Sequence, residues 1–248
     1  MPTTTTPPSS SSDPIGKLHT RIYYHGLLPR EDVEQLLSND GEFLVRRTEV
    51  QDVDTFVLSF YWKGKAYHKL IYERTDDDNV SKRWFLRADR LFKTIPDCIK
   101  YYKSKREPIN DDGALLLEPV ARQKWELLHD QIVMGKKLGY GAFGDVFEGK
   151  LKVRHGRTMP VAIKTLRTTV CDKTLRQQFH AEARIMRKYV HPNVLRLYGV
   201  VAQQPPLLLI TELCPRGSLL SLLRSSGEAR TPAACLRYAL QASNKLLD

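Results

Sequence analysis

Phe43-Leu44-Val45-Arg46 is a run of three apolar residues that ends in an arginine, as in a buried strand. A guanidinium in such a strand is costly to bury without a partner. Its planar, bidentate donors match the oxygens of a phosphate. Only a phosphate on a long aromatic side chain reaches a deep arginine, so we expect Arg46 to select phosphotyrosine over phosphoserine. An ordinary structural ion pair of Arg46 is the alternative if this run stands alone.

The residues around this run predict an α+β unit. Helical spacing of apolar residues predicts helices over 30–37 and 95–102. Between them, a turn at Asn39-Asp40-Gly41 precedes β-rich runs, and the acidic stretch Asp76–Asn79 indicates a loop. The β-rich runs cover residues 42–46, 55–61 and 66–72. The order helix, antiparallel strands, helix is typical of an α+β fold.

Further motifs occur in a fixed order around Arg46. They are Tyr24-His25-Gly26, Arg30, the FLVR run itself, Val57-Leu58-Ser59 and His68. Together these five matches resemble a Src-homology-2 (SH2) domain, an antiparallel sheet flanked by two helices, over residues 22–119. The resemblance implies that phosphotyrosine-containing proteins are the partners of this unit.

The resemblance also implies a role for each pocket residue. Arg46 forms the floor of the phosphate pocket, and Arg30 flanks the tyrosine ring through a cation–π contact. Thr48 and the backbone N–H groups after it complete the cradle. His68 lines the wall, although a satisfied core histidine is the alternative. Lys69 follows His68 where many relatives carry an aromatic residue, so we expect an acidic residue just after the phosphotyrosine.

The second half opens on a glycine-rich stretch, Leu138 to Val146. A G-x-G-x-x-G pattern lets backbone N–H groups approach phosphate oxygens in both dinucleotide-binding and kinase folds. Here the strand-like run Asp145–Leu151 follows the glycines, whereas a dinucleotide fold has a helix there. A lysine on a strand at Val161–Lys164 and Glu182 in a predicted helix over 174–189 come next. Strands are expected at 195–201 and 207–213, and helices at 219–224 and 232–248.

This order resembles the N-terminal lobe of a protein kinase, and the segments Arg196–Val200 and Thr211–Leu213 resemble its tyrosine-kinase branch. ATP is therefore the implied cofactor, held by Lys164 in an ion pair with Glu182. Thr211 controls the depth of the back pocket, and Glu212 and Cys214 offer hinge backbone groups to adenine. The implied ATP-binding residues are Leu138, Gly139, Gly141, Phe143, Gly144, Val146, Ala162, Lys164, Thr211, Glu212 and Cys214.

An SH2 domain directly before a catalytic domain, with no SH3-like segment ahead of it, resembles the Fes/Fer group of non-receptor tyrosine kinases. The intact kinase of this kind phosphorylates protein tyrosine with ATP and Mg²⁺. No H-R-D or D-F-G motif follows Asn193, so the catalytic base and the metal ligands are absent here. We therefore expect a kinase domain cut short within its C-terminal lobe. An inactive phosphotyrosine-binding adaptor is the alternative.

Composition and charge limit the other classes of function. No apolar run approaches the roughly 18 residues of a membrane span, and the four cysteines include no C-x-x-C pair. Residues 1–121 carry a net charge of −1 and residues 122–248 one of +12, with basic residues too scattered to favour nucleic acid. We expect a cytoplasmic location with recruitment to the inner face of the plasma membrane. The predicted layout is a disordered tail (1–21), the SH2 domain (22–119), a short linker (120–131) and the incomplete kinase domain (132–248).

Overall fold

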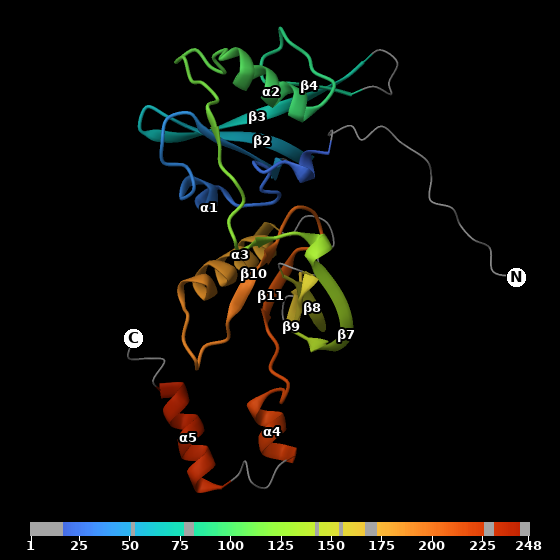
Figure 1. Ribbon diagram of the computed structural model, residues 1–248, viewed down its shortest axis with the longest axis vertical. Helices are drawn as coiled ribbons and strands as arrows, with labels where there is room; N and C mark the ends of the chain where they lie inside the picture. Colours follow the sequence, from blue (N-terminus) through green and yellow to red (C-terminus); the bar gives the residue numbers. More distant parts are fainter. Residues whose placement is uncertain are drawn as a thin grey trace, which may run out of the picture. The chain divides into compact units, whose positions relative to one another are not determined.

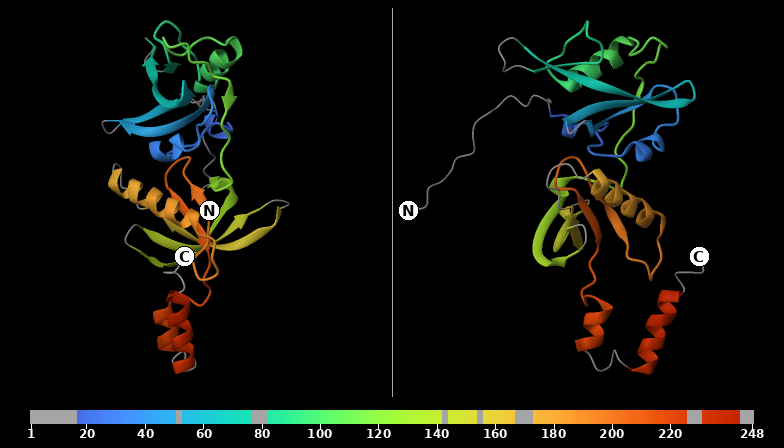
Figure 2. Two further views of the ribbon diagram at one scale, coloured as in Figure 1. Left: turned by 90° about the vertical axis from the view of Figure 1, so that its left-hand side faces the viewer. Right: turned by 180° about the vertical axis from the view of Figure 1, so that it is seen from behind.

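The chain folds into two compact units, residues 1–123 and 124–248, which are described separately. Figures 1 and 2 show the computed structural model. The structure describes residues 17–50, 53–76, 82–141, 144–153, 156–166, 173–225 and 231–243. The division between the units falls inside 120–131, the segment that the sequence predicts as a linker.

The first unit is a five-stranded sheet with a helix on each face. The strand order is β4-β3-β2-β1-β5, with β1 to β4 antiparallel and β5 parallel to β1. Helices α1 and α2 lie on opposite faces of this sheet (Figure 1). The elements are η1 (Leu18–Thr20), α1 (Arg30–Glu34), β1 (Glu42–Val50), β2 (Val53–Trp62), β3 (Lys65–Thr75), β4 (Lys82–Phe85), α2 (Ile95–Lys105) and β5 (Glu118–Pro119).

Strand alternation explains how this sheet divides its residues between the two faces. Phe43 and Val45 of β1 lie in the main core together with Ile99 of α2. Because successive side chains of a strand point to opposite faces, Leu44 and Arg46 face α1. The α+β fold with two flanking helices is therefore as predicted, and the same alternation decides the side on which Arg46 lies.

The folded part of the first unit begins before residue 22, within the segment that the sequence assigns to a disordered tail. Leu18 is fully buried and belongs to the main core. The side chain of Arg122 holds this segment by donating hydrogen bonds to the carbonyls of Arg21 (2.7 Å) and Tyr24 (3.1 Å). A single leucine between polar residues carries no periodicity, which is why the sequence pattern gave no sign of it.

Two other elements of the first unit differ from expectation. Helix α1 ends at Glu34, three residues before the end of the predicted helix at Leu37. Leu37 is nevertheless buried, so the apolar spacing continues beyond the last helical residue. Strand β4 was not predicted, because its four residues, Lys82–Phe85, are two charged residues followed by two aromatic ones and show no alternation. Its pairing with β3 and not its composition makes it a strand.

The second unit is a six-stranded sheet with one helix, α3, between β9 and β10 in sequence and two helices, α4 and α5, after the last strand. The strand order is β6-β10-β11-β9-β8-β7, and α3 lies beside β10 (Figure 1). The elements are β6 (Glu126–Leu127), η2 (His129–Gln131), β7 (Ile132–Tyr140), β8 (Asp145–Lys152), β9 (Thr158–Thr165), α3 (Lys173–Lys188), β10 (Leu197–Val201), β11 (Leu208–Glu212), α4 (Leu219–Ser225) and α5 (Pro232–Ser243). Within the described ranges, no helix is long and apolar enough to cross a bilayer.

The burial of Leu18 leads to a stability prediction. We expect Leu18→Ala to lower the free energy of unfolding of the first unit by about 2–5 kcal/mol, since the side chain is fully buried. Equilibrium urea unfolding followed by tryptophan fluorescence measures this. Ile22→Ala, at a side chain that is 55% exposed, is the control and should change it by less than about 0.5 kcal/mol. Equal losses in the two variants would show that the fold does not depend on Leu18.

Candidate functional site

Arg46 is a buried cation without an acidic partner. Its side chain lies on the α1 face of β1, and the residue is 7% exposed. Its Nε donates a hydrogen bond to Ser59 Oγ at 3.3 Å, and within the described residues no carboxylate lies within ion-pair distance of it. Burial lowers the pKa of the Arg46 guanidinium from its ordinary value, and the charge of Arg30 lowers it further. The guanidinium therefore keeps hydrogen-bonding capacity for an anion from outside.

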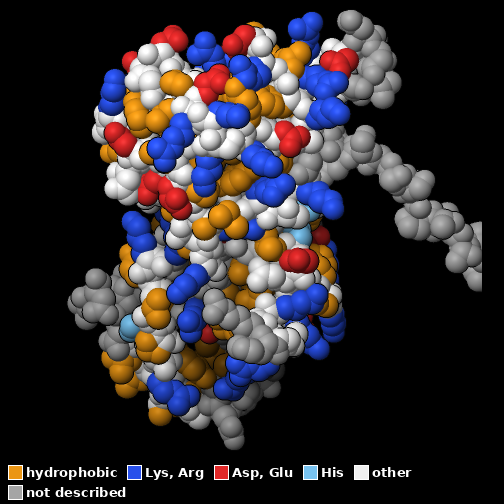
Figure 3. Space-filling model, turned by 45° about the horizontal axis from the view of Figure 1, so that its top comes forward, with side chains coloured by type: hydrophobic (Ala, Val, Ile, Leu, Met, Phe, Trp, Pro, Cys, Tyr) orange, Lys and Arg blue, Asp and Glu red, His pale blue; other side chains and the backbone are white. Residues whose placement is uncertain are grey.

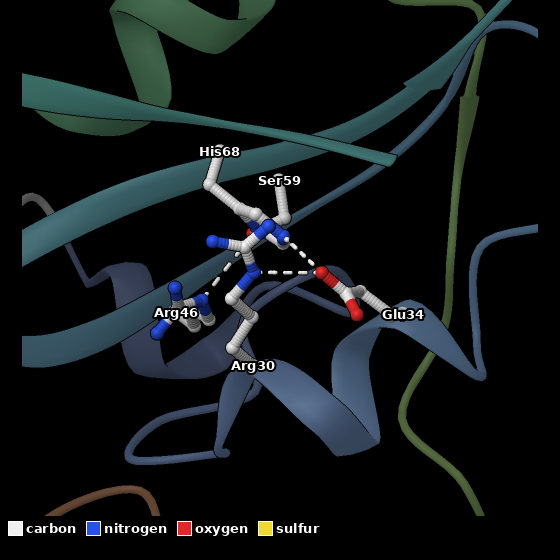
Figure 4. A network of polar contacts seen from close by, with 5 residues as sticks. All are labelled: Arg30, Glu34, Arg46, Ser59 and His68. Atoms are coloured by element: carbon white, nitrogen blue, oxygen red, sulfur yellow. Dashed lines mark hydrogen bonds and ion pairs between the residues drawn. The ribbon is translucent and has the colours of Figure 1, made fainter. Parts of the chain in front are cut away.

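A chain of polar contacts leads from Arg46 to the surface (Figure 4). Ser59 Oγ is hydrogen-bonded to His68 Nδ1 at 2.9 Å, and His68 Nε2 lies 3.2 Å from Glu34 Oε1. The same Glu34 oxygen accepts a hydrogen bond from Arg30 Nε at 2.7 Å. Register explains the first link, because Ser59 pairs directly with His68 between β2 and β3. The structure thus brings Arg46, His68 and Arg30 together around Glu34 and Ser59.

The charges in this network shift the pKa values of its members. Burial lowers the pKa of His68, while its hydrogen bond to Glu34 opposes that effect. The pKa of Glu34 is lowered by the hydrogen bonds from Arg30 and His68. At neutral pH the network therefore holds an ionised Glu34 and a His68 that is less readily protonated than a free histidine.

Thr48 lies on the same face of β1 as Arg46, two residues further along, and is half-buried. The segment after it continues β1 as far as Val50, which pairs with Val53 of β2. The predicted cradle of backbone N–H groups therefore begins in a strand, and residues 51–52 lie outside the described ranges.

In the second unit the structure pairs Lys164 of β9 with Glu182 of α3. Lys164 Nζ donates to both carboxylate oxygens, at 2.8 and 2.7 Å. Both side chains stay partly exposed, 21% for Lys164 and 33% for Glu182, so the ammonium remains within reach of a ligand. The ion pair fixes the long lysine side chain in one position.

Register places three other predicted ATP-binding residues on the same face as Lys164. Val146 of β8 pairs with Lys164, and Ala162 of β9 pairs with Thr211 of β11. Ala162 and Lys164 are two residues apart, so all four side chains share one face of the sheet. Val161 and Ile163, which alternate with Ala162 and Lys164 along β9, are fully buried on the other face. Leu138 of β7 is 51% exposed near the end of the neighbouring strand.

The glycine-rich turn closes the β7–β8 hairpin, where Gly141 N–H donates to the Gly144 carbonyl at 2.8 Å. A Cβ built on Gly139 would meet no heavy atom within 4 Å, and one on Gly141 would meet only the Gly144 carbonyl, at 3.9 Å. By contrast, a Cβ on Gly149 of β8 would lie 2.2 Å from Ile163. Close packing therefore requires a glycine at position 149 but not at positions 139 and 141. The open space beside Gly139 and Gly141 is consistent with a phosphate that approaches the backbone closely. Phe143 lies outside the described residues.

The predicted hinge follows β11. The Glu212 N–H donates to the Arg196 carbonyl at 3.0 Å, and the Cys214 carbonyl accepts from the Gly217 N–H at 3.0 Å. In the part of the chain that the structure describes, the Cys214 N–H has no hydrogen-bond partner. The Cys214 N–H is therefore available to donate a hydrogen bond to the edge of a purine ring. Thr211 is buried at the base of the same face.

Comparisons with known proteins identify a domain family for each of the two units. Residues 23–102 match the SH2 domain, and residues 132–246 match the family described as protein tyrosine and serine/threonine kinase. The chain thus carries an SH2 domain and a protein-kinase domain, and its relatives are SH2-containing tyrosine kinases of the Fps/Fer type. We accordingly call the first unit the SH2 unit and the second the kinase unit.

Named relatives support this assignment. The chain is 39% identical over 208 residues to the tyrosine-protein kinase transforming protein Fps of avian sarcoma virus (strain PRCII), covering 84% of this chain and 37% of that protein. It is 37% identical over 214 residues to Fer-related kinase 1 of Caenorhabditis elegans, covering 82% and 51%. It is 33% identical over 227 residues to tyrosine-protein kinase Fer of Rattus norvegicus, covering 91% and 26%. The chain thus spans about half the length of these relatives or less.

Sequence reasoning missed Glu34, the carboxylate that joins Arg30 to His68 in the SH2 unit. The four-residue spacing of Arg30 and Glu34 on a predicted helix was the available signal, because such pairs face each other. The contact with His68, 34 residues away, depends on the tertiary fold and left no local pattern. Ser59 was recognised as part of a motif, but its bonds to Arg46 and His68 were not foreseen.

Metal ligands do not gather in the described ranges of either unit. No group of three or more His, Cys, Asp or Glu side chains there could hold a metal ion.

The lowered pKa of His68 leads to a prediction about acid stability. In the unfolded chain His68 has a pKa of about 6.5 and binds protons more readily than in the folded state. The stability that His68 contributes is therefore present above about pH 6.5 and declines as the pH falls below it. Urea unfolding of the SH2 unit between pH 7.5 and 5.5 should show a smaller loss in His68→Gln than in the wild type. His19→Gln, at an exposed histidine, is the control, and an equal loss in all three proteins would contradict this account.

Proposed function

We propose that the SH2 unit binds phosphotyrosine in protein ligands through Arg46. The observation that carries this proposal is an arginine that is 7% exposed as a residue and whose guanidinium, among the described residues, is hydrogen-bonded only to the Ser59 hydroxyl. A buried charge of this kind destabilises the fold unless something compensates it. A phosphate dianion supplies that compensation through two charge-assisted hydrogen bonds.

The neighbouring residues prepare Arg46 for this role. The Ser59 hydroxyl holds the Nε edge of the guanidinium, which leaves the two terminal nitrogens for phosphate oxygens. Arg30 is held by Glu34 at 2.7 Å and lies on α1, beside the network. In the bound state Arg30 would turn from Glu34 toward the tyrosine ring and phosphate, and Thr48 would add a hydroxyl donor from the same face of β1.

Replacement of Arg46 gives the direct test. Arg46→Leu should weaken binding of a tyrosine-phosphorylated peptide by at least about 100-fold, because two charge-assisted hydrogen bonds are lost. Its unfolding free energy should not fall, since a buried charge without a carboxylate partner is removed. Isothermal titration calorimetry measures the affinity, and urea unfolding measures the stability.

The adjacent arginine supplies the matched control. Arg47 points to the other face of β1, where it pairs with Asp54. Arg47→Leu should leave phosphopeptide affinity within about twofold of the wild type. Binding that survives Arg46→Leu unchanged would refute the proposed role of Arg46.

We propose further that the kinase unit binds ATP, and that the whole protein to which it belongs phosphorylates protein tyrosine. The support is the ion pair of Lys164 with Glu182, together with glycines that packing does not require. Lys164 would hold the α- and β-phosphates, and the Cys214 N–H would meet the adenine edge. The transferred phosphate comes from ATP, and the residues described here bind and orient it.

An adaptor function is the second candidate for these 248 residues acting by themselves. Their sequence holds no H-R-D or D-F-G motif, which supply the base and metal ligands in kinases. As an adaptor, the chain would bind phosphotyrosine proteins without transferring phosphate. A tyrosine-kinase assay on the purified chain separates the two candidates.

Nucleotide binding has its own test in the kinase unit. Lys164→Met should weaken binding of a fluorescent ATP analogue by about 10- to 100-fold, because one charged donor to the phosphates is lost. Lys152→Met is the control, since Lys152 Nζ donates to the Asp130 carbonyl and lies on an exposed part of β8. Equal analogue affinity in both variants would exclude Lys164 from the nucleotide site.

We also propose that the protein acts in the cytoplasm and reaches the inner face of the plasma membrane through phosphorylated partners. Nucleic acid is the less favoured partner. On the face shown in Figure 3, Lys and Arg side chains are interspersed with apolar and acidic ones over the described residues. Nucleic-acid sites in contrast gather basic residues into a continuous patch or stripe.

A further inference from the structure

A stacked aromatic pair, one exposed ring and one half-buried ring, lies on the same sheet face as the Arg46 pocket. On β3, His68, Leu70 and Tyr72 alternate toward that face, because they are two residues apart. Tyr72 stacks on Phe85 of β4, with ring centroids 5.4 Å apart and planes inclined by 23°. Tyr72 is 47% exposed. We call Tyr72 and Phe85 the aromatic ledge.

The apolar surface continues beyond the ledge along the same face. Val50 and Val53 close the β1–β2 pairing and are 40% and 63% exposed. Val50 is four residues from Arg46 on β1, so it shares the face of Arg46. Single exposed apolar residues are common, but a stacked aromatic pair with two exposed valines on one face indicates a contact surface.

The sheet edge beside the ledge is open. Strand β4 pairs only with the Tyr72–Thr75 part of β3 and ends at Phe85. In the described ranges, the preceding part of β3, Lys65–Ile71, has a strand partner on its β2 side alone. A ligand whose phosphotyrosine reaches Arg46 can therefore cross this edge, directly beside Phe85.

Crossing that edge divides a peptide between the two faces of the sheet. Lys69 points to the α2 face, where the residue after the phosphotyrosine is expected. Leu70 and Tyr72 point to the opposite face, so they meet the residues before the phosphotyrosine. Tyr72 lies about 7 Å along the strand from Leu70, which an extended peptide spans in about two residues.

We propose that the aromatic ledge binds an apolar side chain two or three residues before the phosphotyrosine of the ligand. This inference rests on the proposed function of Arg46. It adds an upstream preference to the recognition of phosphotyrosine itself. The occupant is part of the same peptide, because the ledge is continuous with the phosphate pocket and borders the open edge.

The test uses the full chain and fluorescence anisotropy with matched phosphopeptides. One peptide carries Leu at both upstream positions, two and three residues before the phosphotyrosine, and the other carries Ser there. The wild type should bind the Leu peptide about three- to tenfold more tightly, from the apolar area buried. In Tyr72→Ser/Phe85→Ser this preference should disappear while the Ser peptide binds as before.

Two variants keep the outcome decisive. Tyr72→Ser alone changes a side chain that is 47% exposed, and it should lose most of the preference without unfolding the unit. Ile22→Ser, at an apolar side chain that is 55% exposed away from β3, should retain the full preference.

The failures of the two proposals are distinguishable. Equal affinities of the wild type for both peptides, with binding still abolished by Arg46→Leu, would overturn the ledge and leave phosphotyrosine binding in place. A preference that persists in the double variant would also overturn the ledge. If neither phosphopeptide binds the wild type, the proposed function of Arg46 fails, and the ledge fails with it.

Discussion

The buried guanidinium of Arg46 is the constraint on which the rest of the SH2 unit depends. It follows the core residue Val45 on β1 and pairs with the buried Val57 of β2, so the strand cannot shift without exposing apolar side chains. The sheet therefore fixes Arg46 on the α1 face, and the fold provides the Ser59 hydroxyl in place of a carboxylate. In the proposed function, a dianionic phosphate from the ligand neutralises this charge.

The two units treat their functional cations differently. Lys164 is paired within the protein with both carboxylate oxygens of Glu182. In the proposed function, this pair orients the Lys164 ammonium toward the phosphates of ATP. In the SH2 unit Glu34 is hydrogen-bonded to Arg30 and His68, and among the described residues Arg46 has no direct ion pair, although the charges of Glu31 and Glu34 oppose the lowering of its pKa by burial. A helix glutamate thus holds a cation in each unit, but Arg46 itself is paired with a hydroxyl.

Sequence patterns predicted the features that depend on local alternation and motif order. The strands around Arg46, helix α2 and the strand positions of Lys164 and Thr211 follow from short periodic runs. The burial of Leu18, the pairing of β4 and the contact of Glu34 with His68 did not follow, since each depends on residues distant in sequence. The aromatic ledge belongs to the same class, because the stacking of Tyr72 on Phe85 requires the register of β3 with β4.

The central claim is that the Arg46 guanidinium is itself the phosphate receptor, and the most direct measurement observes its terminal Nη–H groups. In ¹H–¹⁵N NMR spectra of the chain, the Arg46 Nη–H resonances can be followed while a tyrosine-phosphorylated peptide is added. The account predicts a large shift of these resonances and slower exchange of their protons with water, with no change on adding the unphosphorylated peptide. A phosphopeptide that binds while the Arg46 resonances stay unchanged would contradict the account.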